Sequence, residues 1–407
     1  MKKIKRTVLA CLSIFAIFIA AGCTSGSGDP SNTGNVTVTE ESVAETDNYI
    51  SDTRIDVYGI EGLTTMDFVK KMGIGINLGN TFESCGDWIE GSSVKDFETA
   101  WGSPEITREL IEGYKKEGFS SLRIPVAWSN MMSEDYTIDQ NYIERVKEVT
   151  EWALETGLYV VINIHWDGGW FENFPIDKEN CMEKYISIWT QVCENFEEYG
   201  DRLMFESLNE EAGWDSVWDK YSGDDSKKEE AYALVNEINQ TFVDTVRESG
   251  GNNAERHLLI AGYNTDIQLT CDELFKMPDD PFGKCALSVH YYTPSVYCII
   301  DKEVEWGKPK STWGSTRDYN ELENNMNMIY DTYVAKGIPV IIGEYGVNLG
   351  NKDPENVKLF LSSVSREARK RGICPMLWDT NDGGFYDRNI FKMSDEFSDL
   401  GQLLLED

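Results

Sequence analysis

Short apolar runs rich in β-branched residues recur along the chain and alternate with longer segments of helical periodicity. Eight of these runs predict strands, at residues 72–78, 121–126, 159–164, 203–208, 257–261, 286–289, 339–343 and 372–377. Six longer segments predict helices, at residues 104–117, 141–155, 182–199, 229–248, 322–336 and 355–371. Strands and helices that alternate in this way are typical of βα units in a parallel sheet.

Residues that begin and end helices support this pattern. The pair Ser103-Pro104 predicts a helix N-terminus, and glycines close the predicted helices at positions 118, 157, 200, 250, 337 and 372. Residues 271–284 contain only a short helical stretch, so we expect an irregular crossover between strands five and six. Eight parallel strands can close into a (β/α)8 TIM barrel, an α/β fold whose active sites lie at the C-terminal rim of the strands.

Polar and aromatic side chains follow nearly every predicted strand. These rim residues are Asn77, Asn80, Arg123, His165, Trp166, Asn209, Glu210, Asn264, His290, Tyr291, Tyr292, Glu344, Trp378 and Asp379. A sequence selected only for stability would not need such groups at so many strand ends. The pattern therefore predicts an active site at this rim.

Two of the rim residues are glutamates, Glu210 after strand four and Glu344 after strand seven. Cleavage of a glycosidic bond needs one protonated and one ionised carboxyl group, about 5 to 5.5 Å apart when a covalent glycosyl-enzyme forms. A single glutamate after an apolar strand is usually an ordinary strand end. Strands four and seven lie across a barrel mouth, however, so these two long side chains can meet.

Neighbouring side chains predict the role of each glutamate. We expect Arg123 and the hydroxyl of Tyr292 to favour the ionised form of Glu344, which makes Glu344 the nucleophile. Glu210, close to that charge in a partly dry cleft, would keep its proton and act as acid and then as base.

Two further glutamates lie in the same run as Glu210. Glu206 is four residues deeper, about 13 Å below the rim at about 3.3 Å per residue, so we expect a buried structural partner. Glu211 is expected to face away from the reacting centre.

Longer motifs carry a resemblance that covers most of the chain, from about Gly73 to Met393. They are Gly-Ile-Asn-Leu-Gly-Asn-Thr at 75–81, Thr-Ala-Trp-Gly-Ser-Pro at 99–104, Leu-Arg-Ile-Pro-Val at 122–126, Ile-Asn-Ile-His-Trp-Asp-Gly-Gly-Trp at 162–170, Phe-Glu-Ser-Leu-Asn-Glu at 205–210, Ser-Val-His-Tyr-Tyr-Thr-Pro at 288–294, Val-Ile-Ile-Gly-Glu-Tyr-Gly at 340–346 and Leu-Trp-Asp-Thr-Asn-Asp-Gly-Gly-Phe-Tyr-Asp-Arg-Asn at 377–389. These segments resemble glycoside hydrolase family 5, and specifically its subfamily 4 of endo-β-glucanases.

The resemblance implies a retaining endo-β-1,4-glucanase that hydrolyses cellulose, mixed-linkage glucan or xyloglucan by double displacement, without a cofactor. Asn209 would hold the 2-hydroxyl of the sugar, and Trp378 would be the floor on which the sugar stacks. A second histidine often follows the position of His165 in this family; here it is Trp166, which affects one neighbouring subsite. Eight residues take the family's active-site places: Arg123, His165, Asn209, Glu210, His290, Tyr292, Glu344 and Trp378.

Further aromatic residues could bind a glycan chain, because the C–H faces of sugars pack on indole rings. Eight tryptophans fall in predicted loops after strands, at positions 88, 101, 166, 170, 214, 218, 306 and 313. We expect about half of them to pack the loops instead. Trp170, Trp166 and Asn77 are predicted to bind substrate.

The first 22 residues predict a bacterial lipoprotein signal peptide. Basic residues precede an apolar run from Val8 to Ala21, which ends in Ala20-Ala21-Gly22-Cys23. An uncleaved membrane helix is the alternative, but the run is shorter than the roughly 20 residues that a span needs. Lipidated Cys23 would anchor the exported protein at the cell surface by its acyl chains.

Residues 23–51 are polar and contain no aromatic residue before Tyr49, so they predict a disordered tether. Residues 52–407 then form one catalytic domain. The formal charge of −34 becomes −38 when the four cations of the signal peptide leave, which disfavours nucleic acid, anionic lipid and acidic polysaccharide as partners. A neutral β-linked plant cell-wall polysaccharide fits best, bound by a monomer.

Seven cysteines remain after Cys11 and Cys23, an odd number that cannot pair completely within one chain. Several lie in apolar segments, where free buried thiols are common. The chain has three histidines and no Cys-x-x-C pair, so no metal site is expected.

Two other functions remain open at this stage. An endo-acting mannanase or xylanase would share the same mechanism, and no residue distinguishes it. A lipoprotein that binds oligosaccharides without cutting them would need the aromatic residues but not the two glutamates.

Overall fold

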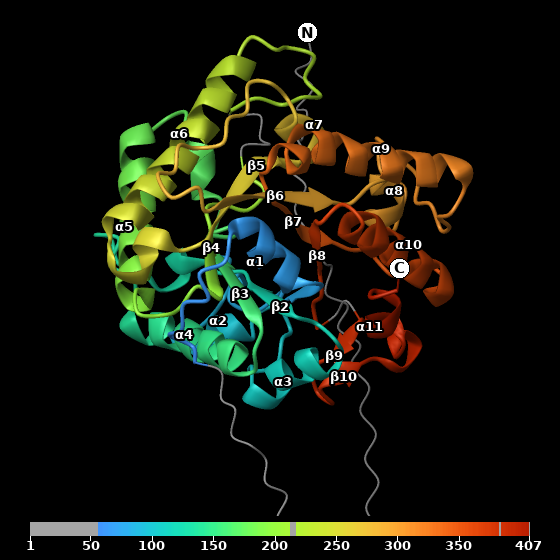
Figure 1. The fold of residues 1–407 in the computed structure, drawn as a ribbon, viewed down its shortest axis with the longest axis horizontal. Coiled ribbons are helices and arrows are strands. Elements are labelled where there is room, and N and C mark those ends of the chain that lie inside the picture. The colour runs from blue at the N-terminus through green and yellow to red at the C-terminus, as the bar shows by residue number, and fades with distance from the viewer. Residues whose placement is uncertain (1–55, 212–216, 382–383, 407) are drawn as a thin grey trace, which may run out of the picture. The chain divides into compact units, whose positions relative to one another are not determined.

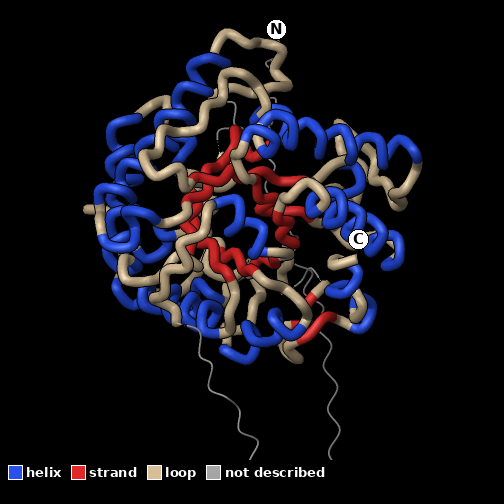
Figure 2. The backbone as a smooth tube through the Cα atoms, viewed as in Figure 1, coloured by secondary structure: helices blue, strands red, loops and turns tan. Residues whose placement is uncertain are grey.

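Eight parallel strands form a closed barrel in which β1 to β8 are neighbours in chain order and β8 pairs with β1. The computed structural model describes residues 56–211, 217–381 and 384–406. Figure 2 shows the ring of strands at the centre, enclosed by helices. The predicted (β/α)8 barrel is confirmed. The strands are β1 (Gly75–Asn77), β2 (Ser121–Ile124), β3 (Tyr159–Asn163), β4 (Leu203–Glu206), β5 (Leu258–Asp266), β6 (Cys285–Tyr291), β7 (Val340–Tyr345) and β8 (Cys374–Leu377).

All six predicted helices are present, with boundaries that shift by a few residues. They are α3 (Arg108–Lys116), α4 (Gln140–Glu155), α5 (Lys178–Phe196), α6 (Lys228–Glu248), α9 (Thr316–Thr332) and α10 (Pro354–Arg369), and Figure 1 shows them around the barrel. Shorter elements are α1 (Thr65–Met72), α2 (Val94–Glu98), α7 (Ile267–Thr270), α8 (Ser295–Cys298), α11 (Leu400–Leu403) and the hairpin of β9 (Tyr386–Asp387) with β10 (Lys392–Met393). The crossover from β5 to β6 is irregular, as expected, with only the four-residue α7.

Helix α1 closes the N-terminal end of the barrel. Its buried residues Phe68, Val69 and Met72 pack against the inward side chains of the strands, which are Tyr159, Val161, Met204, Leu259, Ala286, Ile341, Cys374 and Met376. In Figures 1 and 2, α1 lies in the middle of the strand ring. A larger cluster of apolar residues fills the layer between strands and helices. The barrel is therefore packed below its C-terminal rim, and only the rim is available for chemistry.

Three expectations about local structure need correction. Thr107, not Ser103, caps α3, because its side chain accepts a hydrogen bond from the backbone N–H of Leu110 at 3.3 Å. Gly118, Gly157, Gly250, Gly337 and Gly372 have positive φ, as helix-ending glycines should, but Gly200 does not. A Cβ at Gly200 would lie 2.0 Å from the carbonyl oxygen of Gly59, so close backbone packing requires that glycine. Strand β5 continues to Asp266, five residues beyond its predicted end.

All seven cysteines of the barrel are free, as predicted, and five of them are buried: Cys85, Cys181, Cys193, Cys298 and Cys374. The predicted signal peptide, Cys23 and the tether lie outside the described residues. Within the described residues, every helix is too short or too polar to cross a bilayer.

Candidate active site

The two predicted catalytic glutamates meet at the C-terminal rim. Glu344 is the fifth residue of β7, and Glu210 follows β4 by four residues. One oxygen of each carboxylate and one nitrogen of His290 all lie within 4.8 Å of one another. The Glu344 side chain is 6% exposed, whereas that of Glu210 is 38% exposed. This separation fits double displacement, which needs carboxyl groups about 5 to 5.5 Å apart, rather than the wider spacing of inverting enzymes.

Arg123 of β2 is the centre of the buried network that positions these groups. Its guanidinium donates to Glu344 at 2.8 Å, to Glu206 at 2.6 Å, to Asn209 at 2.9 Å and to Asn77 at 3.0 Å. Arg123 is fully buried, so its charge is unscreened by water. The planar fork of arginine suits such a role, because it offers five donors in fixed directions.

Glu344 has the predicted partners, but burial has the larger effect on its ionisation. The hydroxyl of Tyr292 donates to Glu344 at 3.0 Å, next to the Arg123 contact. Removal from water raises the pKa of Glu344 above its ordinary value, and the charges of His290 and Arg123 only partly oppose this. Arg123 and Tyr292 thus contact Glu344 as expected, and both contacts favour its ionised form. The contacts are present, but desolvation outweighs them.

Tyr292 and His165 both stay uncharged in the site. Burial and the nearby charge of Glu344 raise the pKa of Tyr292 well above its usual range, so its hydroxyl remains a donor. Burial, with the charges of Arg123 and His290, lowers the pKa of His165 far below that of free histidine. His165 thus contributes shape and dipole rather than charge.

His290 connects to the acid/base glutamate. Its Nδ1 atom lies 2.7 Å from Oε1 of Glu210, and its Nε2 atom has no hydrogen-bond partner in the described part of the chain. His290 lies at the end of β6, between the strands that carry the two glutamates. This hydrogen bond holds the partly exposed Glu210 carboxyl group towards Glu344.

Trp378, directly after β8, is half-buried at the rim, and its role as a sugar platform stays a prediction. Its ring is stacked with that of His165, with an interplanar angle of 7° and centroids 5.6 Å apart. Gly79 makes room for this indole, since a Cβ at residue 79 would lie 2.9 Å from the Trp378 ring. Trp166 is also half-buried at the rim, and its role in substrate binding stays a prediction.

Two predicted substrate-binding residues have other roles. Asn77 is fully buried and donates to the carbonyl oxygens of Gly343 and Leu377, while its own oxygen accepts from Arg123. It therefore positions Arg123 and does not reach substrate.

The ring of Trp170 packs against other side chains of the protein. Its ring stacks on Phe171 with centroids 4.0 Å apart, the Lys184 ammonium lies over it at 4.7 Å from the centroid, and its N–H donates to Asp167 at 2.8 Å. The ring faces are occupied, so the prediction of a subsite at Trp170 is wrong. Trp218 and Trp313 are buried packing residues as well, in line with the expectation that part of the tryptophan set packs loops.

Asn163, a supporting residue within β3, was not predicted from the sequence. Its Nδ2 donates to Glu206 at 3.0 Å, and Ser288 donates to the other oxygen of Glu206 at 2.7 Å. Glu206 is thus a buried structural partner, as predicted. The available signal was a polar residue inside an apolar strand, which a buried position tolerates only when the side chain is hydrogen-bonded.

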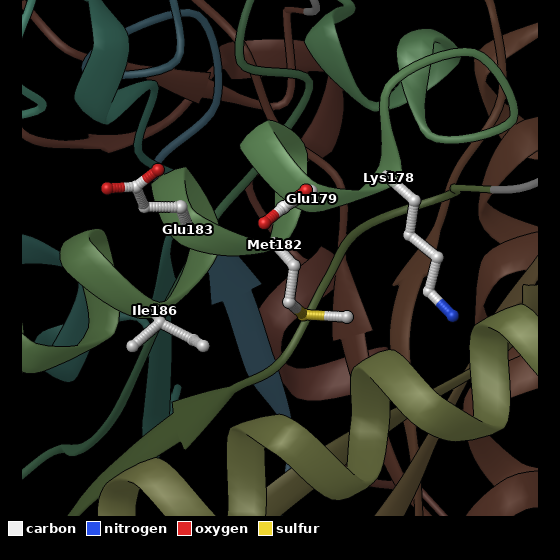
Figure 3. Close-up of a pocket in the computed structure, with 5 residues that line it drawn as sticks. All are labelled: Lys178, Glu179, Met182, Glu183 and Ile186. Atoms are coloured by element: carbon white, nitrogen blue, oxygen red, sulfur yellow. The ribbon is translucent and has the colours of Figure 1, made fainter.

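Other candidate sites are weaker. Within the described residues, the one group of possible metal ligands that lies close together is Glu210, His290 and Glu344, and Arg123 already pairs with Glu344. A hollow on α5 contains no rim residue, and Figure 3 shows that its lining comes from one helix: Lys178, Glu179, Met182, Glu183 and Ile186. The chemistry belongs to the carboxylate pair.

The arrangement can perform both steps of glycoside hydrolysis. Glu344 can attack the anomeric carbon while Glu210 gives its proton to the leaving oxygen, and the ester that forms removes the charge of Glu344. Glu210 can then take a proton from the attacking water. The Asn209 side chain is fixed through its oxygen by Arg123, which leaves its N–H₂ group as a donor for a sugar hydroxyl.

Comparison with known proteins agrees with this geometry. A family model described as Cellulase (glycosyl hydrolase family 5) matches residues 83–384. Endoglucanase A of Paenibacillus barcinonensis is 33% identical to this chain, and the match covers 85% of this chain and 89% of the relative. A xyloglucan-specific endo-beta-1,4-glucanase of Bacteroides ovatus is 35% identical, and that match covers 87% of this chain and 72% of the relative. A solved GH5-4 broad specificity endoglucanase from an uncultured bovine rumen ciliate superposes with a TM-score of 0.74 at 34% identity, covering 84% of this chain and 98% of that one.

The matched segment contains both glutamates and the rim residues around them, from Arg123 to Trp378. The barrel, the carboxylate pair and the relatives agree, and the chain therefore belongs to glycoside hydrolase family 5, the cellulase family.

Proposed function

We propose that this protein is a retaining endo-β-1,4-glucanase that cuts neutral β-glucan chains within their length. The observation that carries the proposal is the pair Glu210 and Glu344, whose oxygens lie within 4.8 Å across the rim, with Arg123 and Tyr292 on Glu344. The net charge of −34 favours an uncharged polymer over an acidic one. The endoglucanases among the relatives support cleavage of β-1,4-linked glucan.

Xyloglucan belongs among the candidate substrates, because the Bacteroides ovatus relative is xyloglucan-specific by name. A panel of carboxymethyl cellulose, mixed-linkage β-glucan, xyloglucan, glucomannan and xylan, with sizing of the products, tests the proposal. Mid-chain products from at least one β-glucan support it. Release of sugars only from mannan or xylan would replace it with the corresponding activity.

The mechanism has a separate test. E344Q should bind glycan but release no reducing ends, and the first product of the wild-type enzyme should keep the β configuration when followed by proton NMR. An α-configured first product would contradict double displacement. Cleavage by E344Q at the wild-type rate would remove Glu344 from the mechanism.

We also propose that Cys23 is lipidated and that the enzyme is displayed as a monomer at the bacterial cell surface, joined to it by residues 24–51. The support is the sequence Ala20-Ala21-Gly22-Cys23 after an apolar run, followed by a polar segment. C23A should move the enzyme from the membrane fraction to the medium without changing its kcat/KM, and size-exclusion chromatography of the soluble form should give the monomer mass. Retention of C23A in the membrane would contradict the anchor.

A further inference from the structure

The end of β5 has a backbone conformation that its sequence does not favour. Asn264 and Thr265 both have positive φ, 49° and 45°. Left-handed conformations are uncommon outside glycine, and for a β-branched residue such as Thr265 they are strained. Such strain persists only where the surrounding structure imposes it, and it gathers at functional sites.

The surrounding structure holds this turn from both sides. Between Ala261 and Asp266, β5 advances five residues while β6 advances two, so β5 carries a three-residue bulge. Before the turn, the ring of Tyr263 stacks on Tyr232 with centroids 4.2 Å apart. After the turn, Asp266 caps α7.

Further contacts tie the bulge to the loop after β4. Asp266 forms an ion pair with Lys220 at 2.6 Å, and the backbone N–H of Asn264 donates to the carbonyl oxygen of Glu211 at 3.1 Å. Glu211 directly follows the acid/base Glu210. The bulge therefore fixes Asn264 beside the loop that carries the proton donor.

The side chain of Asn264 has no role within the described residues. Thr265 is fully buried and its hydroxyl donates to the Asn264 carbonyl oxygen, whereas Asn264 is half-buried. The Asn264 carboxamide forms no hydrogen bond with residues 56–211, 217–381 or 384–406. A strained turn that presents an amide at the rim, with no hydrogen-bond partner among the described residues, is a candidate contact for a ligand.

The position of Asn264 around the rim indicates which partner that is. Trp378 after β8 and His165 after β3 stack together on the half of the rim formed by β8, β1, β2 and β3. Asn264 lies near the end of β5, the strand next to β4, on the side of β4 away from β3. Because Glu210 protonates the departing oxygen, the sugar that leaves lies beside Glu210 on the side away from Trp378.

We propose that Asn264 binds a hydroxyl of the glucose unit on the leaving-group side of the cut, and so sets how strongly the enzyme depends on that unit. A carboxamide suits a neutral sugar because it offers both a donor and an acceptor. This inference rests on the proposed glucanase function.

The test uses the full enzyme and two substrates. Cellopentaose places glucose units on both sides of the cut, whereas 4-nitrophenyl β-cellobioside has an aryl leaving group without hydroxyls. N264G removes the amide while glycine tolerates the positive φ. We expect N264G to lower kcat/KM for cellopentaose by about 3- to 10-fold, the effect of one neutral hydrogen bond. Its kcat/KM for the aryl substrate should stay within about 2-fold of the wild-type value.

N351G is the matched control, because Asn351 has φ 58° but is exposed after β7. N351G should change Tm by as much as N264G does, and it should leave kcat/KM for both substrates unchanged. Equal losses on both substrates for N264G, or no loss on cellopentaose, would overturn the inference. A wild-type enzyme that cleaves no glucan would instead overturn the proposed function.

Discussion

At the scale of single residues, Glu344 shows two opposed influences on one carboxyl group. Burial disfavours its charge, while Arg123 and Tyr292 stabilise it through contacts of 2.8 and 3.0 Å. The nucleophile must be ionised to attack, so activity is lost as the pH falls through the pKa of Glu344. Since burial raises that pKa, the acid limb of kcat/KM should lie above the ordinary glutamate value of 4.5.

Y292F should move this acid limb further towards neutral pH. The change removes a donor that favours the ionised form, so it raises the pKa of Glu344 and moves the acid limb with it. The measurement is the pH profile of kcat/KM. Y297F is the control, because the Tyr297 hydroxyl donates to Asn356 at the same 3.0 Å outside the site; an unchanged acid limb in Y292F would contradict the assignment.

G79A should displace the Trp378 indole, the predicted sugar platform. A Cβ at residue 79 would lie 2.7 Å from the carbonyl oxygen of Asp379 and 2.9 Å from the Trp378 ring, both closer than real contacts allow. A shift of about 1 Å can cost about 10²-fold in rate, and we expect a fall in kcat/KM of at least about 10-fold with altered tryptophan fluorescence. G346A should be close to wild type, since its Cβ meets Trp378 at an ordinary 3.4 Å. Equal behaviour of the two variants would argue against a fixed Trp378.

The sequence predicted which site residues lie at strand ends, but it did not predict which side chains they contact. Glu210, Glu344 and Arg123 could be placed because each follows or lies within an apolar run that must be a strand. Asn77 and Trp170 were assigned to substrate because a sequence does not show which hydrogen bonds and ring faces the protein itself uses. Those depend on contacts between residues that are distant along the chain, such as Asn77 with Leu377.

At the scale of elements, hydrophobic periodicity predicted all eight strands and six helices, whereas their ends depend on local capping. The pair Ser103-Pro104 has the composition of a helix start, yet Ser103 is buried. Its hydroxyl accepts a hydrogen bond from the Arg388 guanidinium at 2.5 Å and lies 3.2 Å from the hydroxyl of Thr81. The long-range contact with Arg388 uses the hydroxyl that would have capped the helix, so α3 begins after Thr107. The bulge of β5 escaped prediction for a related reason, because its left-handed residues are not glycines.

T107A should test this cap. Loss of the hydrogen bond to the Leu110 N–H at 3.3 Å should lower the free energy of unfolding by about 1 kcal/mol, with an unchanged slope in urea and unchanged kcat/KM. P104A should have a smaller effect on α3, because residue 104 precedes the helix. A larger loss in P104A than in T107A would restore the sequence-based helix start.

At the scale of the whole molecule, the first described segment and the active site lie at opposite ends of the barrel. The described chain begins at residue 56, and its first segment, 56–64, packs against the residues that precede β4. Gly200 donates to the Val57 carbonyl at 2.8 Å, and Arg202 pairs with Glu61 at 2.6 Å. Residues before a strand lie at the N-terminal end of the barrel, whereas Glu210 and Glu344 lie at the opposite rim. Segment 56–64 is therefore remote from the two glutamates.

Asp201 is the residue on which this separation can be tested. Its carboxylate is buried and accepts the backbone N–H groups of Glu61, at 2.9 and 3.0 Å, and of Gly62, at 3.0 Å. D201N turns one acceptor oxygen into an N–H₂ group that faces these donors, so segment 56–64 should loosen at a cost of about 1 to 3 kcal/mol. Hydrogen–deuterium exchange should rise in residues 56–64 while kcat/KM stays within about 2-fold.

D56N is the matched control, because within the described residues the carboxylate of the exposed Asp56 accepts only a local hydrogen bond, from the Tyr58 N–H. It should leave both exchange and activity near wild type. A fall in the kcat/KM of D201N in proportion to its loss of stability would mean that the N-terminal end of the barrel communicates with Glu210 and Glu344. The packed layer of α1 and the inward strand residues lies between the two ends, and its full burial is the physical reason to expect that a loosened surface segment does not shift the rim.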